Sequence, residues 1–421
     1  MKKLKLTREE WYWSLYDMAN SAFILMLTAM IPPYVATIGQ EMGLSGAQTS
    51  SDWAFVQSGS TLVIALMAPF LGVLADRKGK KKLFFNWFFF LGVAMFFVMA
   101  FVDNYYVLLA VNLLTGIGYA GANIFYDAFL IDVTTDERMD FISSLGYAVG
   151  YVGSCIPFIV SIILYMTTPF GLDAMTAIKV GIFINALWWL LFTLPMIRRV
   201  HQRYYTEGSR KKVVSSALKK LWGTLKLIAH NKTIGLFLLA YFFYIDGVDT
   251  VIKLSTSYGQ SVGLDTTAMI VALLVTQLVA FPAVMLFAKI SKQLSTKKVL
   301  LFSVLVYVGI CIFGYFMAEE WQFWIMAVVV GMVQGTIQAL SRSYFGKLIP
   351  KENNNEYFGF YNIFGKYATI IGPVLMGVFT RVTGNSRYGV LSICILFVAG
   401  FVILLFVPDA SGVAQAQEKG E

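Results

Sequence analysis

The stretch GVLADRKGKKK, residues 72–82, contains the end of one apolar segment, 53–75, and a short basic loop that leads into a second one, 83–102. About 20 consecutive apolar residues are enough for a helix to cross the hydrocarbon core of a bilayer, and each segment reaches that length. The chain of 421 residues is 58% hydrophobic and only 14% charged, whereas about a quarter of a soluble domain is charged. The sequence therefore predicts an integral membrane protein, and the loop joins two of its spans.

Apolar segments of spanning length recur along the whole chain. They do not alternate apolar and polar residues as the strands of a membrane barrel would, so we expect an all-α fold. The twelve expected spans are 12–37, 53–75, 83–102, 105–131, 141–168, 176–196, 233–257, 266–288, 298–317, 321–345, 356–382 and 388–407.

Basic residues collect on alternate connections between these spans. The basic connections are the N-terminal segment, 76–82, the connection that contains Arg138, 197–232, 289–298 and 341–350. The connections between them hold only Lys179, Arg381 and Arg387. Because cytoplasmic loops are enriched in Lys and Arg, both termini are expected in the cytoplasm, with the protein in the cell membrane. The net charge of +9 is then a signal of topology, and no soluble basic patch predicts nucleic-acid binding.

The longest connection divides the spans into six and six. We expect an N-terminal bundle over 1–196, a cytoplasmic linker over 197–232, a C-terminal bundle over 233–407 and a disordered tail over 408–421. In the linker, the stretch SSALKKLWGTLKLIAH places leucines on one face and lysines elsewhere, which is typical of an amphipathic helix on a membrane surface.

The two halves of the chain contain similar stretches of sequence. GYAVGYVGSCIP at 146–157 and GKYATIIGPVLMG at 365–377 both combine spaced glycines with a proline. Small residues allow close contact between helices, and proline bends a span. Two six-helix repeats are the layout of transporters whose substrate site lies near the middle of the membrane.

The loop at 72–82 resembles the signature G-x-L-a-D-R-x-G-R-K-K of the major facilitator superfamily. The matching residues are Gly72, Leu74, Asp76, Arg77, Gly79, Lys81 and Lys82, with Lys80 in place of Arg. We predict that the glycines allow tight packing and that Asp76 holds a basic group or helix N-terminus of the second half in one state. For Lys81 and Lys82, the alternative is an ordinary positive charge on a cytoplasmic loop.

Three further stretches narrow the resemblance. They are WYWSLYDMANSAF at 11–23, YFFYIDGVDTVI at 241–252 and the long stretch 335–373. They are similar to the vacuolar-effluxer-like branch around the yeast autophagy-related amino-acid effluxer, which has bacterial members. The resemblance implies secondary transport without a cofactor, with amino-acid export known for the yeast branch. FYDAFLID departs from that branch, because Asp127 and Ile131 replace its Asn and Pro.

Polar residues concentrate in the first, fourth, seventh and tenth spans, which line the central cavity in major facilitator folds. A charge at the centre of a membrane helix costs roughly 2.5–3.5 kcal/mol, so such residues face a cavity or a partner. The residues assigned to a substrate and proton pathway are Asp17, Asn20, Asn123, Asp127, Asp246, Asp249, Lys253, Gln334, Gln338, Arg342 and Lys366. Beside them, Tyr16, Tyr126 and Tyr244 are candidates for cation–π contact with an amine, or for ordinary packing.

Asp17 and Asp127 are expected at similar depth on neighbouring spans. At that distance two acids can share one proton. The alternative is that each of them pairs with Lys366, Arg342 or a backbone group.

On the seventh span, Asp249 and Lys253 stand four residues apart, in the order that favours a helical ion pair. Asp246 has no base beside it on the same helix. We predict that it carries a proton or contacts a substrate ammonium, and that Gly247 loosens the helix and exposes its carbonyls.

Together these features predict a monomeric secondary transporter of a small zwitterion or cation, coupled to protons, with amino-acid efflux as the leading case. Transport of a lipid or lysolipid and a nutrient sensor that does not transport are the alternatives. An enzyme is not expected, since the chain lacks a Walker pattern for ATP and the Gly-x-Gly-Asp of intramembrane aspartyl proteases. The three cysteines do not have metal-ligand spacing.

Overall fold

The computed structural model describes residues 5–206, 231–261 and 266–409, together with Gly223, Lys226 and Ile228. Over these residues the secondary structure is helical, and the recorded β-type contact is an isolated bridge between Arg77 and Thr206. The expected all-α fold is confirmed. Most of the predicted amphipathic helix of the linker and of the polar tail lies outside the described residues.

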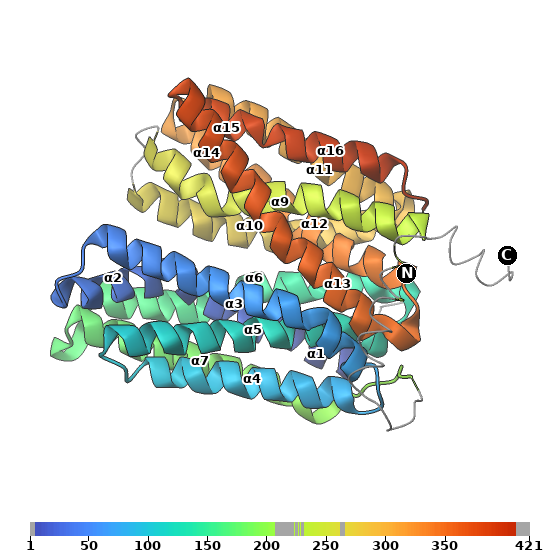
Figure 1. The fold of residues 1–421 in the computed structure, drawn as a ribbon, viewed down its shortest axis with the longest axis horizontal. Helices are drawn as coiled ribbons and strands as arrows, with labels where there is room; N and C mark the ends of the chain where they lie inside the picture. The colour runs from blue at the N-terminus through green and yellow to red at the C-terminus, as the bar shows by residue number, and fades with distance from the viewer. Residues whose placement is uncertain are drawn as a thin grey trace, which may run out of the picture. The chain divides into compact units, whose positions relative to one another are not determined.

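Unit 1 is the first of two compact units and comprises residues 1–134, 149–211 and 351–359. Its helices are α1 (Arg8–Ala29), α2 (Ile31–Glu41), α3 (Gly46–Ala75), α4 (Lys80–Met99), α5 (Tyr105–Val133), most of α6 (Asp136–Thr167), the 3₁₀ turn η1 (Pro169–Gly171) and α7 (Ala174–Arg199). Helix α4 packs along α5, and α1 packs along α7 (Figure 1).

Unit 2 comprises residues 135–148, 212–350 and 360–421. Its helices are α9 (Lys232–Ser261), α10 (Thr266–Leu294), α11 (Thr296–Phe316), α12 (Glu320–Leu348), α14 (Ile371–Thr383), α15 (Ser386–Ser392) and α16 (Cys394–Leu405). Helix α13 (Asn354–Tyr367) begins in unit 1, after the turn η2 (Lys351–Asn353), and continues in unit 2. In unit 2, α10 packs along α12, and α16 packs along α9.

Ten of the described helices are long and apolar enough to cross a membrane, and α1 with α2 forms an eleventh candidate as one bent span. These candidates overlap the expected spans. The expected span 356–382 differs, because the turn η3 (Ala368–Ile370) separates α13 from α14.

The 43° bend between α1 and α2 follows from the sequence. Pro32 and Pro33 stand in the first turn of α2. Proline lacks a backbone N–H, so it is tolerated at the start of a helix and interrupts the hydrogen bonds of a helix that would run through it. The first expected span therefore forms as two helices that meet at Met30.

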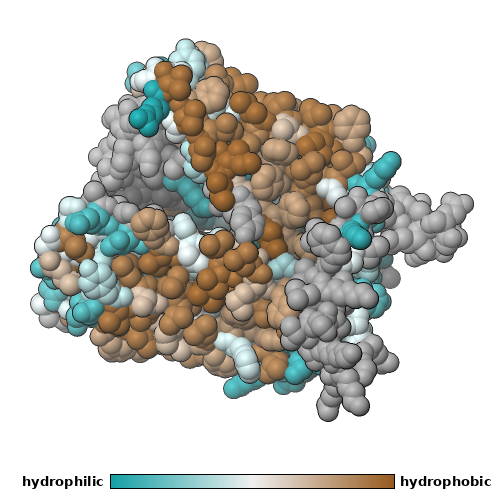
Figure 2. All heavy atoms as spheres, viewed as in Figure 1, coloured by the Kyte–Doolittle hydropathy of each residue, from teal (hydrophilic) through white to brown (hydrophobic). Residues whose placement is uncertain are grey.

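Hydrophobic side chains cover the outward sides of the helices. In Figure 2, hydrophobic residues (brown) extend over the visible sides of the helices in both units, and hydrophilic residues (teal) gather towards helix ends. Phe55, Leu66, Trp87, Phe302 and Val382 are all at least 50% exposed. Apolar exposure over so many helices is unfavourable in water and favourable in lipid, which agrees with a membrane protein.

Candidate functional site

Gly72 and Asp76, in the stretch 72–82, are buried and contact the start of α13 in unit 1. The Asp76 carboxylate accepts hydrogen bonds from the backbone N–H of Asn355, at 3.0 Å, and from its side-chain amide, at 2.8 Å. A carboxylate suits this position because the first N–H groups of a helix have no partner within the helix. The predicted contact between Asp76 and a helix N-terminus from the second half of the sequence is therefore present.

The two glycines of the loop are required for different reasons. A Cβ on Gly72 would lie 2.5 Å from the carbonyl oxygen of Asn355, so a larger residue would push the start of α13 away. Gly79 has φ +72°, which is in the left-handed region where other residues are strained. Its conformation lets α4 begin directly after the loop.

Lys81 is fully buried, so the alternative of an ordinary loop charge is wrong for this residue. Its ammonium pairs with Asp132 at the end of α5 and donates to the side-chain oxygen of Asn354 at 2.9 Å. The backbone N–H groups of Arg203 and Tyr204 donate to the second Asp132 oxygen, at 2.7 and 3.0 Å. Arg77 is half-buried and bridges to the backbone of the same segment after α7.

Helices α1 and α5 bring an acid and aromatic rings together. The Tyr126 hydroxyl donates to the Asp17 carboxylate at 2.9 Å. The Tyr126 ring stacks on Trp13 with centroids 4.5 Å apart and lies 4.7 Å from the ring of Tyr16. All four side chains are buried, and we call them the acid–aromatic cluster.

A second polar contact joins the same two helices. The Asn20 side-chain amide donates to the Asn123 side-chain oxygen at 3.0 Å. Asp127 is half-buried, whereas Asp17 is 8% exposed. The predicted pathway residues of the first and fourth spans thus lie along one contact between α1 and α5.

On α9, the three charged residues have different surroundings. The ammonium of Lys253 lies 3.9 Å from an Asp249 oxygen, and both side chains are partly exposed, so the predicted ion pair is confirmed. Asp246 is fully buried. Its two carboxylate oxygens accept the backbone N–H of Gly372, in the first turn of α14, at 3.0 and 2.9 Å.

The predicted loosening of the seventh span at Gly247 is wrong. Helix α9 is continuous from Lys232 to Ser261. A Cβ on Gly247 would lie 2.6 Å from the ring of Phe397, so this glycine allows α16 to pack closely against α9. The break lies in the expected eleventh span, at η3.

The other predicted pathway residues of unit 2 are dispersed. The Tyr244 hydroxyl is buried, 2.7 Å from that of Ser341. The Arg342 guanidinium is buried and donates to the hydroxyl and carbonyl of Ser143, both at 3.0 Å. Gln338 is half-buried on α12, and the side chain of Lys366 lies outside the described residues.

Sequence reasoning missed a charged cluster in unit 2. Asp140, near the start of α6, is 5% exposed. Its carboxylate accepts hydrogen bonds at 2.6–3.1 Å from Ser291, Thr296, Ser343 and Lys347.

The position of this cluster could have been found from the internal repeat. Lys347 follows Thr296 by 51 positions, the same interval that separates Asp132 from Lys81. The two clusters therefore occupy equivalent places in the two halves. The lysine stands at the start of α4 in the first cluster and at the end of α12 in the second.

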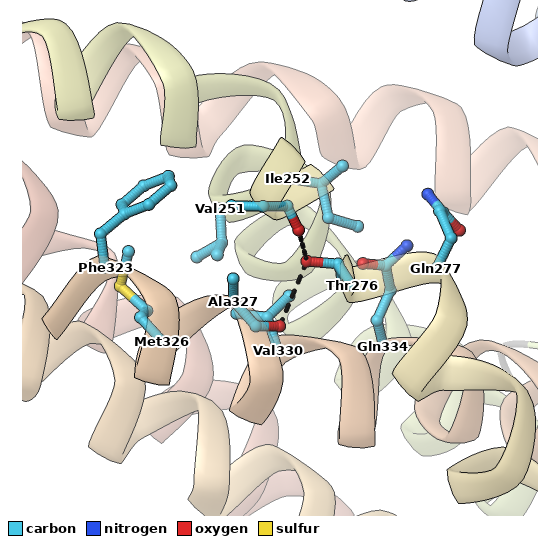
Figure 3. A pocket seen from close by; sticks show the side chains of 10 residues that line it. Val251, Ile252, Thr276, Gln277, Phe323, Met326, Ala327, Val330 and Gln334 are labelled. Carbon is cyan, nitrogen blue, oxygen red and sulfur yellow. Dashed lines mark hydrogen bonds between the residues drawn. The ribbon is translucent and has the colours of Figure 1, made fainter. Parts of the chain in front are cut away.

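A pocket of about 60 Å³ lies among α9, α10 and α12 (Figure 3). Figure 3 shows Phe323 and Met326 at one end and the amides of Gln277 and Gln334 at the other. The hydroxyl of Thr276, between them, donates to two helix carbonyls. The other described lining residues are Val251, Ile252, Ala272, Ala327 and Val330, so the described lining carries no charge.

In the described part of the chain, no group of three or more His, Cys, Asp or Glu side chains could hold a metal ion. Cys155, Cys311 and Cys394 are free thiols.

The sequence matches the family described as "Vacuole effluxer Atg22 like" over residues 6–417. The chain belongs to this family. This Atg22-like protein is 44% identical to the "Uncharacterized MFS-type transporter YxiO" of Bacillus subtilis (strain 168), over 99% of both chains. The predicted resemblance is therefore confirmed.

Fungal relatives are more distant and longer. "Autophagy-related protein 22-1" of Neosartorya fischeri is 26% identical over 63% of this chain and 46% of its own length. "Autophagy-related protein 22" of Cryptococcus neoformans is 27% identical over 66% of this chain and 52% of its own length. The Atg22-like protein thus aligns with about half the length of these relatives.

Solved structures share the fold. The major facilitator superfamily transporter FucP, in the outward conformation, has a TM-score of 0.72 at 15% identity, covering 94% of this chain and 98% of that chain. The human organic anion transporter MFSD10 has a TM-score of 0.69 at 14% identity, covering 94% and 99%. Family and fold together make the Atg22-like protein a membrane transporter of the major facilitator superfamily, and not an enzyme.

Proposed function

We propose that the protein is a secondary active transporter that exports amino acids, or closely similar zwitterions and cations, in exchange with protons. The acid–aromatic cluster carries this proposal. It places a buried carboxylate, Asp17, against a tyrosine hydroxyl and aromatic rings on two membrane-spanning helices. Acids within spans mark substrate and proton pathways, and aromatic faces attract an ammonium group.

Exchange follows from competition for one carboxylate. The Asp17 carboxylate binds a proton or an ammonium, and binding of one displaces the other. The Tyr126 hydroxyl donates to the carboxylate and keeps it oriented in both steps. Asp127, the next residue on α5, supplies a second acid that can take up the displaced proton.

The pocket in unit 2 supports a substrate with an uncharged portion. Its described lining is mostly apolar, and Gln277 and Gln334 add hydrogen-bonding amides. Helix α9, which contributes Val251 and Ile252 to the lining, also carries the partly exposed pair of opposite charges Asp249 and Lys253. That combination suits a zwitterion better than a free anion.

We place the protein in the cell membrane. The proposed topology has twelve spans, with both termini in the cytoplasm. The ten candidate helices and the bent pair α1–α2 supply eleven spans, and the broken pair α13–α14 supplies the twelfth. The Asp76–Asn355 contact then lies on the cytoplasmic side. We assign it to one state of the transport cycle, to be released in the other. The functional unit is a monomer.

A reconstitution experiment tests the proposal. Purified protein is reconstituted in liposomes loaded with ¹⁴C-labelled amino acids, and an inward proton gradient is applied. Loss of ¹⁴C from the liposomes measures amino-acid efflux, and an internal pH dye measures proton entry. We expect efflux of a subset of amino acids together with proton entry, both reduced at least about tenfold in Asp17→Asn. Movement of a labelled lysolipid without amino-acid movement would support the lipid alternative. A ligand that raises the melting temperature but is not moved would support the sensor.

A further inference from the structure

Asp246 holds the start of α14 on α9. Both of its oxygens lie within 3.0 Å of the Gly372 nitrogen, and the Thr250 hydroxyl, one turn further along α9, lies 3.4 Å from one of them. The Asp246 side chain has no exposed surface. Its carboxylate is therefore engaged by a backbone donor from another helix.

Gly372 stands directly after the break in the expected eleventh span. The first N–H groups of a helix lack partners within the helix, and a carboxylate satisfies them and interacts favourably with the helix dipole. Pro373, the next residue, has no N–H and is tolerated in a first turn. The start of α14 thus has the local sequence of a helix that begins here, and Asp246 supplies its cap from α9.

The space at Gly372 is matched to this contact. A Cβ there would lie 2.0 Å from the Thr250 hydroxyl oxygen and 2.8 Å from an Asp246 oxygen. Only a residue without a side chain lets the backbone N–H reach the carboxylate. Asp246, Thr250 and Gly372 are fitted to one another as a contact between α9 and α14.

We propose that Asp246 is not the proton carrier or ammonium contact expected from the sequence but a positioning residue for transport, which fixes α14 on α9 and keeps the eleventh span broken at η3. The transport readout of this proposal rests on the proposed function. The geometry requires an acceptor for the Gly372 N–H, and an asparagine carbonyl is as good a helix cap as a carboxylate. A proton carrier, in contrast, requires a group that ionises, so an asparagine at this position separates the two roles.

The test compares four variants in nanodiscs and liposomes. Asp246→Asn keeps an acceptor, Asp246→Leu removes it, and Gly372→Ala blocks the approach. Gly377→Ala, on the same helix, is the matched control, because a Cβ there meets no atom within 4 Å. Hydrogen–deuterium exchange of peptides that contain the Gly372 amide reports the contact without any substrate, and ¹⁴C-amino-acid efflux reports transport.

We expect Asp246→Asn and Gly377→Ala to keep the Gly372 amide protected. Both should export amino acids within about twofold of the wild-type rate, with the same pH profile. Asp246→Leu and Gly372→Ala should expose the amide and slow efflux by at least about tenfold. Should Asp246→Leu not fold, Gly372→Ala and Asp246→Asn make the same comparison.

Two results would overturn the proposal. One is loss of efflux, or of its pH dependence, in Asp246→Asn while the Gly372 amide stays protected, which would make Asp246 a proton carrier. The other is unchanged protection of the Gly372 amide in both Asp246→Leu and Gly372→Ala. If the wild-type protein moves no amino acid, the proposed function fails, and the exchange data still decide whether Asp246 positions α14.

Discussion

Asp17 receives its hydrogen bond from a residue 109 positions away, the Tyr126 hydroxyl on α5. Trp13 and Tyr16 come from the same helix as Asp17, and all three lie within two turns of α1. A single buried acid thus lies beside three aromatic rings that pack on one another. This arrangement makes Asp17 the first residue to test.

Asp17→Asn keeps the size of the side chain and its acceptor oxygen but cannot bind and release a proton. We expect amino-acid efflux from proteoliposomes to fall by at least about tenfold and the remaining activity to lose its pH dependence. Asp173→Asn is the control, because Asp173 is an exposed cap of α7 and asparagine caps equally well. Wild-type rate and pH profile in Asp17→Asn would refute the proposed exchange.

Lys81 and Asp132 give a prediction about stability. Lys81→Met leaves the Asp132 carboxylate buried without its cation, and such a loss costs about 3–5 kcal/mol. Thermal unfolding in detergent should show a clearly lower melting temperature, with most of the loss recovered in the double variant Lys81→Met/Asp132→Asn. Lys80→Met, at an exposed position, is the control. Equal stability of the two single variants would contradict a structural role for the buried pair.

At the scale of elements, glycines mark where helices approach closely. Gly72 meets the start of α13, Gly247 meets α16, and Gly372 meets α9. The sequence shows the glycines but not the partner of each one, since that depends on the rotation of every helix about its axis. For this reason the prediction from sequence placed a loosened helix at Gly247, whereas the structure breaks the eleventh expected span at η3.

Gly72→Ala should weaken the contact between the loop and α13. The added Cβ would lie 2.5 Å from the Asn355 carbonyl oxygen, and overpacking of this kind costs about 1–3 kcal/mol. We expect a lower melting temperature and faster hydrogen exchange at the start of α13. Gly309→Ala, on α11, has no atom within 4 Å of the new Cβ and should leave both quantities unchanged. An unaltered exchange rate in Gly72→Ala would show that the contact is not needed for this part of α13.

At the scale of the whole molecule, the two units are not simple halves of the sequence. Unit 1 includes residues 351–359, and unit 2 includes residues 135–148. Each of these segments is held by buried polar groups: Asn355 by Asp76 in unit 1, and Asp140 by Lys347 and three hydroxyls in unit 2. The internal repeat is thus also seen in these contacts, because in each unit polar side chains bind a segment that comes from the other half of the sequence.

The proposed topology predicts which loops reach each side of the membrane. In a variant without native cysteines, Asp103→Cys, in the loop after α4, should react with an impermeant maleimide added to intact cells. Lys80→Cys, at the start of α4, should react only after permeabilisation, and a C-terminal fluorescent protein should fluoresce in the cytoplasm. Both positions are exposed. Labelling of Lys80→Cys in intact cells would reverse the orientation.

The sequence by itself determined that the chain is a helical membrane protein, where most of its long apolar helices lie and which family it belongs to, because hydropathy and the loop signature are local patterns. It also determined the Asp249–Lys253 pair, which one helix turn creates. Only the tertiary structure decided that Lys81 is buried against Asp132 and that Asp246 meets Gly372, 126 positions away. Such pairings depend on how helices distant in sequence pack, and no local pattern encodes that packing.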